Sequence, residues 1–277
     1  MSSLDSLPTE QPGKTPLITG KKRKHSSSAR CNHNWTKKSI FFELSYWSKL
    51  KLRHNLDVMH IEKNVCDNIV GTLLGIEGKS KDTDEARMDL HDLKIREELW
   101  LIKRESRAPL KPRALHTFSK EEKKGFLDFL RSIKLPDGYA SNIKRCVTDD
   151  GRLYGLKTHD CHVLIQKLLP VGILPYLNDN IRETLIEFCN FFKKICSRTL
   201  LKSEIKELKE GIVIVLCKLE KIFPPAFLTI MVHLCIHLPE QALLGGPVST
   251  RWMFGYIKII CEKQCTTRKV DCSSLCC

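Results

Sequence analysis

The sequence predicts a mainly α-helical protein, organised as a compact helical bundle. Three observations support this class. Apolar residues recur every three or four positions in several segments, which is the period of one helix face. Capping signals and proline or glycine residues bracket those segments. The chain has 277 residues, of which 42% are hydrophobic, so it can bury a substantial core in one or two domains.

The first segment, residues 1–34, is expected to be a disordered basic lead. It is rich in Ser, Pro, Thr, Gly and Lys and shows no apolar period. It contains a run of basic residues: Lys21, Lys22, Arg23 and Lys24. We interpret this run as a nucleic-acid-binding element or a nuclear address, and a solvated charged tail explains it equally well.

The first ordered segment starts near Ile40 with an aromatic stretch that fits either a strand or a short helix. A clear helical stripe follows, at every fourth residue: Ile61, Val65, Ile69 and Leu73. This stripe predicts an amphipathic helix over residues 60–74. Gly75 and Gly78 are expected to stop it.

Two capping signals predict the next helices. Asp82 followed by Glu85 resembles a capping box and is expected to open a helix that runs towards Trp100. Ser119 with Glu122 repeats the signal before a second apolar stripe. The turn at residues 136–138 ends that second helix, and together with the basic linker before it suggests a domain boundary near residue 140.

The second half is expected to be more helical. Its apolar stripes predict helices at residues 161–169, 181–200, 205–223 and 226–238. The third has one continuous apolar face: Ile205, Leu208, Ile212, Val215, Leu219 and Ile222. Prolines are expected to end three of these helices, because proline lacks the N–H that a helix interior needs.

Charge and cysteine usage narrow the class of partner. The formal net charge is +14, from 46 Lys and Arg against 32 Asp and Glu, which favours nucleic acid first and acidic proteins second. No apolar run approaches the roughly 20 residues of a membrane span, so no membrane partner is expected. The 13 cysteines mostly lie singly on apolar helical stretches, which favours reduced thiols in a reducing compartment. No cofactor or small-molecule substrate is predicted.

Asp57 and His60 form the most suggestive local pair. A carboxylate at the start of a helix, with a histidine one turn on, could hold a divalent cation. The alternative is that Asp57 is an ordinary helix N-cap and that His60 is structural.

Other groups of metal-ligand residue types have weaker spacing. The run from His159 to His162 and the pair His233 and His237 contain zinc-type ligands but lack a second half at zinc-site spacing, so buried polar anchoring is expected and no metal is predicted. Residues 75–80 resemble the end of a phosphate-binding loop and are better explained as a helix stop. Residues 255–277 form an aberrant Cys-rich tail without paired thiol spacing.

Several longer runs carry a family resemblance. Residues 35–44, 53–68 and 79–83 resemble the end of the transposase domain of En/Spm-like (CACTA) plant elements. Residues 138–143, 159–164, 217–225, 244–248 and 251–253 are similar to the domain of unknown function that follows it. The resemblance assigns residues 35–140 to a C-terminal remnant of the transposase domain and residues 141–254 to a helical transposon-associated domain.

The resemblance implies an acidic triad that cuts and joins DNA with Mg²⁺ on an RNase H-like fold. Asp57 and His60 match the acidic-x-x-His motif of related families and are therefore vestigial catalytic candidates, with Glu240 a weak third acid. Nothing upstream of Trp35 resembles the β-rich catalytic core, so at most a residual piece of that fold is expected, and Mg²⁺ only in a complete family member.

The functional expectation is a truncated, catalytically inactive transposase-like protein. Its expected partners are DNA and transposase subunits, and its expected location is the nucleus, with the cytoplasm as the alternative. A domesticated, non-catalytic DNA- or protein-binding module is the second hypothesis.

Overall fold

A computed structural model of the chain describes residues 39–105, 107–135, 142–148 and 151–251. It divides into two units, Met1–Arg53 and His54–Cys277. The described part of the first unit contains two short 3-10 helices, Ile40–Glu43 and Trp47–Lys49. The ring of Phe41 stacks on Trp47 at 4.8 Å between centroids. The aromatic stretch is therefore helical, one of the two alternatives that the sequence left open.

The second unit is mainly α-helical, as predicted, and its first helix is α1, Val58–Leu73. The Asp57 side chain caps α1 by accepting a hydrogen bond from the backbone N–H of His60. Gly75 follows with φ +60°, a left-handed conformation that glycine adopts without strain and that ends the helix. All four residues of the predicted stripe are buried: Ile61, Val65, Ile69 and Leu73.

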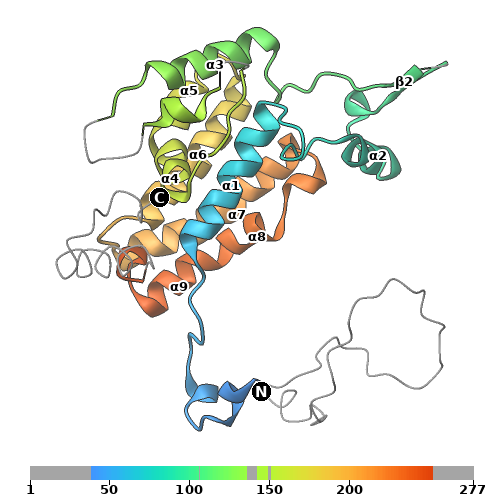
Figure 1. The fold of residues 1–277 in the computed structure, drawn as a ribbon. Helices are drawn as coiled ribbons and strands as arrows, with labels where there is room; N and C mark the ends of the chain where they lie inside the picture. Colours follow the sequence, from blue (N-terminus) through green and yellow to red (C-terminus); the bar gives the residue numbers. More distant parts are fainter. Residues whose placement is uncertain (1–38, 106, 136–141, 149–150, 252–277) are drawn as a thin grey trace, which may run out of the picture. The chain divides into compact units, whose positions relative to one another are not determined.

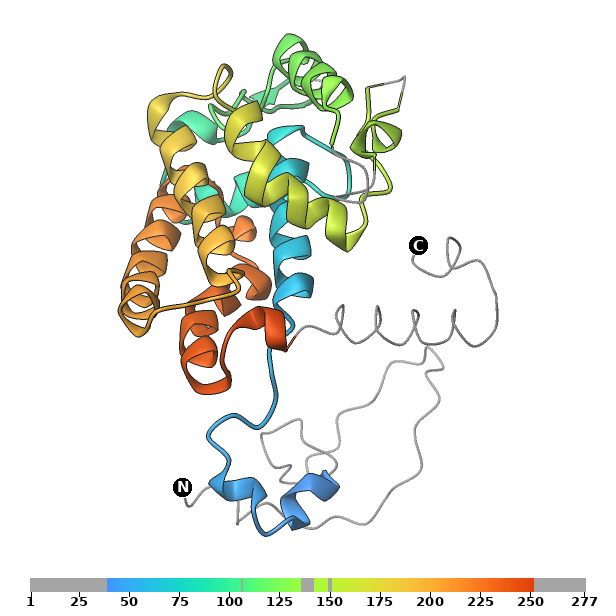
Figure 2. The same cartoon turned by 90° about the vertical axis from the view of Figure 1, so that its left-hand side faces the viewer.

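The remaining helices, apart from α2 (Asp84–Asp92) beside the β-ribbon, gather around α1 (Figures 1 and 2). Their bounds are α3 Lys120–Ser132, α4 Thr158–Val163, α5 Leu169–Gly172, α6 Asp179–Ile195, α7 Lys202–Ile222, α8 Ile230–Leu234 and α9 Leu238–Gly245. Helices α4 and α8 pack on α1, α6 packs on α7, and α7 packs on α9. One hydrophobic cluster runs through this unit from Val58 to Val248, so side chains from both sides of residue 140 share a core. The segment boundaries at residues 34, 140 and 254 remain predictions.

A β-ribbon projects from the helices (Figure 1). Its strands, β1 (Ile102–Arg104) and β2 (Arg107–Leu110), are antiparallel, with Ile102 opposite Leu110 and Arg104 opposite Arg107. This is the one sheet among the described residues, beside an isolated bridge between Val147 and Leu153. The described part of the chain therefore contains no RNase H-like sheet.

The helix predicted to start at Asp82 begins later and ends earlier than expected. Helix α2 is Asp84–Asp92, and its N-cap is Thr83, whose hydroxyl accepts a hydrogen bond from the N–H of Ala86 at 3.2 Å. The prediction of a capping box at Asp82 and Glu85 was wrong, because the Asp82 side chain is buried in an ion pair with Arg87. After Asp92 the chain adopts positive φ at Lys94 and Arg96, so α2 does not reach Trp100.

Prolines interrupt the second half less than predicted. Pro170 lies inside a continuous helical stretch, where α4 passes through a π-helical turn, Leu164–Leu168, into α5. Because proline cannot donate to the carbonyl four residues earlier and its ring crowds that group, a widened turn before it relieves the clash. Pro239 is in the first turn of α9, where a missing N–H costs little.

Two other helix bounds differ from the prediction. Helix α6 ends at Ile195 rather than at residue 200. The segment 226–238 is split into a 3-10 helix at Pro225–Phe227, then α8, then a 3-10 helix at Cys235–His237. In contrast, α3 and its capping box at Ser119 and Glu122 are confirmed, as is the buried face of α7. The predicted turn at residues 136–138 lies outside the described residues.

The described cysteines are free thiols, as expected: Cys66, Cys146, Cys161, Cys189, Cys196, Cys217 and Cys235. Cys217 differs from the expected buried thiols because its side chain is exposed. Among the described helices, none is both long and apolar enough to cross a bilayer.

Candidate functional site

Asp57 and His60 lie at the exposed start of α1. One carboxylate oxygen of Asp57 is 3.1 Å from the backbone nitrogen of His60, the geometry of an N-cap. The backbone N–H of Leu56 donates to the Gln241 side chain on α9 at 2.8 Å, which holds this end of α1. Glu240, the weak third acid, forms an exposed ion pair with Lys209 at 3.2 Å. Capping therefore accounts for the Asp57 side chain, and its vestigial catalytic role remains a prediction.

The sequence also singled out the pair His233 and His237, the segment 75–80, the basic run and the Cys-rich tail. His233 and His237 are both exposed, with ring centroids 5.2 Å apart, so buried anchoring was wrong for this pair. Gly75 and Gly78 adopt positive φ, and residues 75–80 form the predicted helix stop. The basic run at residues 21–24 and the Cys-rich tail at residues 255–277 lie outside the described residues.

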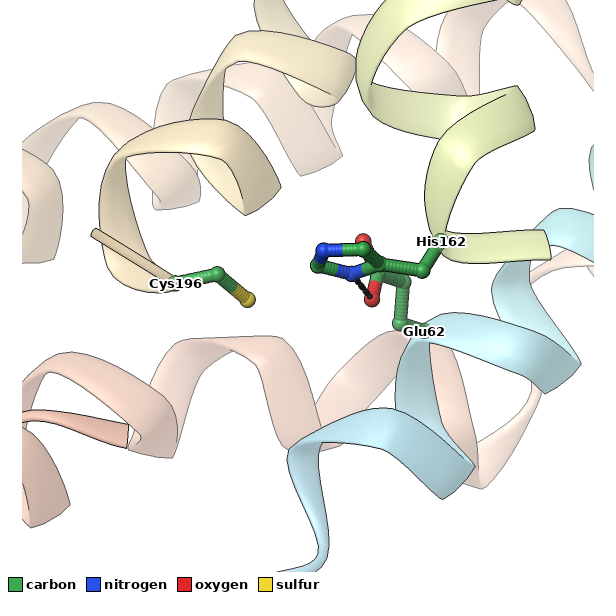
Figure 3. A group of neighbouring side chains, drawn as sticks. All are labelled: Glu62, His162 and Cys196. Atoms are coloured by element: carbon green, nitrogen blue, oxygen red, sulfur yellow. Dashed lines mark hydrogen bonds and ion pairs between the residues drawn. The ribbon is translucent and has the colours of Figure 1, made fainter. Parts of the chain in front are cut away.

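Three helices bring a cluster of metal-ligand side chains together in the core (Figure 3). Glu62 comes from α1, His162 from α4, and Cys196 directly follows α6. One potential ligand atom of each lies within 4.8 Å of the others, and the Nδ1 atom of His162 is 2.6 Å from a carboxylate oxygen of Glu62. Gln166 donates from its amide to the other oxygen of Glu62 at 2.8 Å. We name these four residues the Glu62 cluster.

The electrostatics of the Glu62 cluster are those of a buried anion among thiols. The Glu62 side chain is 1% exposed, and its ion pair within the described residues is the one with His162, which is 20% exposed. Burial, reinforced by the Glu62 carboxylate, raises the pKa of the Cys196 thiol well above its ordinary value. The same two causes raise the pKa of Cys189. The nearby thiols are therefore neutral and do not add to the negative charge.

The shape of the Glu62 cluster does not fit a nucleophilic relay. In such a relay the sulfur and the carboxylate hydrogen-bond to opposite nitrogens of the imidazole, which places them roughly 6–7 Å apart. In this protein the sulfur of Cys196 lies within 4.8 Å of a Glu62 oxygen. The three groups form a compact triangle, which suits a shared polar network or a cation better than acyl transfer.

A second buried network surrounds Asp82, next to α2. Arg87 is 1% exposed and donates to Asp82 at 2.7 Å and to the backbone carbonyl of Leu99 at 2.7 Å. The ring of His116 lies 3.2 Å from the same carboxylate. Burial opposes ionisation of Asp82, but hydrogen bonds from His116 and Arg87 outweigh it and hold the pKa of this carboxyl far below its ordinary value. This network anchors the base of the β-ribbon.

The β-ribbon and its flanks are strongly basic. Residues 101–113 contain one acidic residue, Glu105, and a series of basic residues: Lys103, Arg104, Arg107, Lys111 and Arg113. Lys103 and Arg104 are exposed. Lys111 and Arg113 also line a surface cleft of about 750 Å³ beside the ribbon, together with Lys81. Glu77 and Asp82 line the same cleft, and Lys111 and Arg113 form ion pairs with Asp82 and Glu122, so the cleft carries both signs of charge.

Sequence reasoning identified one member of the Glu62 cluster, His162, and missed its partners. The signal for Glu62 was present: it lies four residues after Val58 and four before Cys66, on the buried face of α1. A carboxylate on such a face needs a partner from elsewhere in the fold. The partner is 100 residues away in sequence, which no local pattern reveals.

The fold and these sites together define a mainly helical protein with a basic β-ribbon and two buried ionic networks. Residues 195–275 match the family described as Domain of unknown function (DUF4218). This family is typical of plant transposon-related proteins, so the match indicates a transposon-associated domain. The described part of the match begins at the end of α6 and includes α7, α8 and α9. No curated protein and no solved structure matches the chain.

Proposed function

We propose that this chain is a transposase-derived protein of the En/Spm-like (CACTA) type that binds double-stranded DNA in the nucleus without catalysing strand transfer. The family match at residues 195–275 and the sequence resemblance over residues 35–254 support the transposon origin. The net charge of +14 supports a polyanionic partner. The basic run at residues 21–24 supports nuclear import and a further phosphate contact.

The β-ribbon is the observation that carries the DNA-binding proposal. Two antiparallel strands form a ribbon narrow enough for the major groove, which is about 12 Å wide. Lys103 and Arg104 extend from β1 into solvent and have no ion pair within the described residues. Their charges are therefore available for phosphate oxygens. The exposed side chains of Ile102 and Leu110 lie opposite each other and offer apolar contact to bases or sugars.

Two observations support the proposal that this chain does not catalyse strand transfer. Strand transfer of the family type needs several carboxylates that converge on paired metal ions. Within the described part of the chain, the only set of three potential ligand side chains is that of Glu62, His162 and Cys196, which supplies one carboxylate. Asp57 is occupied as a helix cap.

Salt-dependent DNA binding tests the proposal. We expect duplex DNA to bind the chain with an affinity that falls steeply as salt rises, because phosphate contacts release counterions. The variant Lys103→Gln/Arg104→Gln should bind more weakly, and its log–log salt slope should be shallower by about 2, one for each lost contact. Fluorescence anisotropy with a labelled duplex at several salt concentrations measures both quantities.

The matched control removes two charges from another surface. Lys202 and Lys206 are exposed at the start of α7, and the variant Lys202→Gln/Lys206→Gln should retain the wild-type slope. Equal salt slopes for the ribbon variant and the wild type would refute DNA binding by the β-ribbon and would favour the protein-binding alternative. Mg²⁺-dependent nicking of supercoiled DNA by the purified chain would refute the non-catalytic assignment.

A further inference from the structure

The Glu62 cluster contains more ligand chemistry than a structural network requires. A buried carboxylate needs cationic or hydrogen-bonding partners, and His162 and Gln166 already supply one to each oxygen of Glu62. Cys196, which follows α6, adds a thiol whose sulfur lies within 4.8 Å of a potential ligand atom of each of the other two groups. Carboxylate oxygen, imidazole nitrogen and thiolate sulfur are the three ligand types that zinc takes in proteins.

We propose that Glu62, His162 and Cys196 bind a zinc ion that joins α1, α4 and the end of α6. The proposal is independent of DNA binding. The charges balance, because one carboxylate, one thiolate and a neutral imidazole compensate the two positive charges of Zn²⁺. A neutral site of this kind suits the core, where an uncompensated charge is costly. Binding releases the thiol proton of Cys196 to solvent.

The geometry requires only small side-chain movements. Ligand atoms of a tetrahedral zinc site lie roughly 3.3–3.7 Å from one another. The 2.6 Å contact between Glu62 and His162 would therefore open, and the sulfur, now within 4.8 Å, would move inward. These changes are within the range of a rotamer adjustment about the last side-chain torsions.

Gln166 supplies a fourth ligand position. Its amide nitrogen is 2.8 Å from Glu62 and 3.1 Å from the Nδ1 atom of His162, so the amide group already lies against both ligands. Rotation of the amide by half a turn presents its carbonyl oxygen to the ion instead of its nitrogen. Gln166 lies in the π-helical turn before Pro170, and such turns often occur at functional sites.

Cobalt substitution tests the site directly. The background is the full chain in which five tail cysteines are replaced by serine, because the tail could bind metal by itself: Cys261, Cys265, Cys272, Cys276 and Cys277. After chelator treatment under reducing conditions, Co²⁺ is titrated and the sulfur-to-cobalt absorption and the tetrahedral visible bands are recorded. We expect one equivalent of Co²⁺ to bind and an equivalent of Zn²⁺ to displace it.

Substitutions then assign the ligands. Cys196→Ser should abolish the sulfur-to-cobalt band, and His162→Gln should weaken Co²⁺ binding by more than the roughly 10- to 100-fold that loss of an outer-shell partner costs. Cys217→Ser, at an exposed cysteine on α7, should leave the spectrum unchanged. Far-UV circular dichroism confirms that each variant is folded. Absence of Co²⁺ binding in the background, or an unchanged band in Cys196→Ser, would overturn the proposal.

Discussion

At the residue scale, Asp82 and Arg87 form an ion pair in which both side chains are buried. It replaces the capping role that the sequence predicted for Asp82. Arg87 is fully enclosed and reaches the carbonyl of Leu99, so one side chain ties α2 to the chain that enters the ribbon. Loss of either partner would leave a buried charge without compensation.

We therefore predict that Asp82→Asn destabilises the fold by about 3–5 kcal/mol, the usual effect of breaking a buried pair. The effect should depend on pH. Because the pKa of Asp82 is lowered in the folded state, its stabilisation is complete above the unfolded pKa of about 4 and is lost as pH falls below that value. Urea unfolding at neutral and acid pH measures the difference between variant and wild type, which should shrink on acidification.

Asp84 provides the matched control for this experiment. It is 58% exposed and lies 3.9 Å from the same Lys111 that approaches Asp82. Asp84→Asn should change the free energy of unfolding by less than about 1 kcal/mol at neutral pH. A similar loss in both variants would show that burial of the pair is not the cause.

Side-chain hydrogen bonds could be predicted where the two partners lie within a few positions of each other in the sequence. The cap at Asp57 and the capping box at Ser119 were visible because each bonds to a backbone group three residues away. The contacts of Asp82 with His116 and of Glu62 with His162 could not be predicted, because the partners lie 34 and 100 residues apart in the sequence.

At the element scale, packing around individual glycines distinguishes tight from open helix contacts. A Cβ atom added at Gly172 in α5 would lie 2.7 Å from the ring of Phe129 and 2.8 Å from the ring of Phe126. At Gly211, in the middle of α7, the same atom meets nothing within 4 Å. The contact between α3 and α5 therefore depends on the missing side chain, and α7 has room for one.

This contrast predicts opposite effects of the same substitution. Gly172→Ala should destabilise the protein by about 1–3 kcal/mol, because the aromatic rings must shift in a packed core. Gly211→Ala should stabilise it by about 1 kcal/mol, since alanine is the better helix former. Chemical denaturation of both variants tests this pair, and destabilisation by Gly211→Ala would contradict it.

Helix stripes were predicted well and helix ends less well. The face of α7 from Ile205 to Ile222 is buried as its period indicated. The prediction failed at Pro170, where a π-helical turn absorbs the proline and the helix continues. It failed again at residues 226–238, where tertiary packing divides one apolar stripe into α8 and short 3-10 turns. Local periodicity does not contain this information.

At the scale of the whole molecule, the shared core bears on the predicted boundary near residue 140. Residues before it, such as Cys66 on α1, and residues after it, such as Cys189 on α6, belong to one hydrophobic cluster. We expect the unit His54–Cys277 to lose its packing in one transition.

Thiol labelling can test this expectation, because Cys66 and Cys189 are both fully buried. Their labelling by a thiol reagent should increase at the same urea concentration, and far-UV circular dichroism should change with it. Exposed Cys217 should react without denaturant and serves as the internal control. Two separate midpoints for Cys66 and Cys189 would support independent domains on either side of residue 140.

The position of α1 has a consequence for how this protein is made. It is the first helix of its unit to leave the ribosome, yet it packs on α4 and α8, and the residue before Asp57 bonds to Gln241, 185 positions later. The part of the α1 stripe that packs on α8 therefore stays uncovered until α8 has been synthesised. Nascent chains of this protein should depend on holding chaperones until α8 and α9 have left the ribosome.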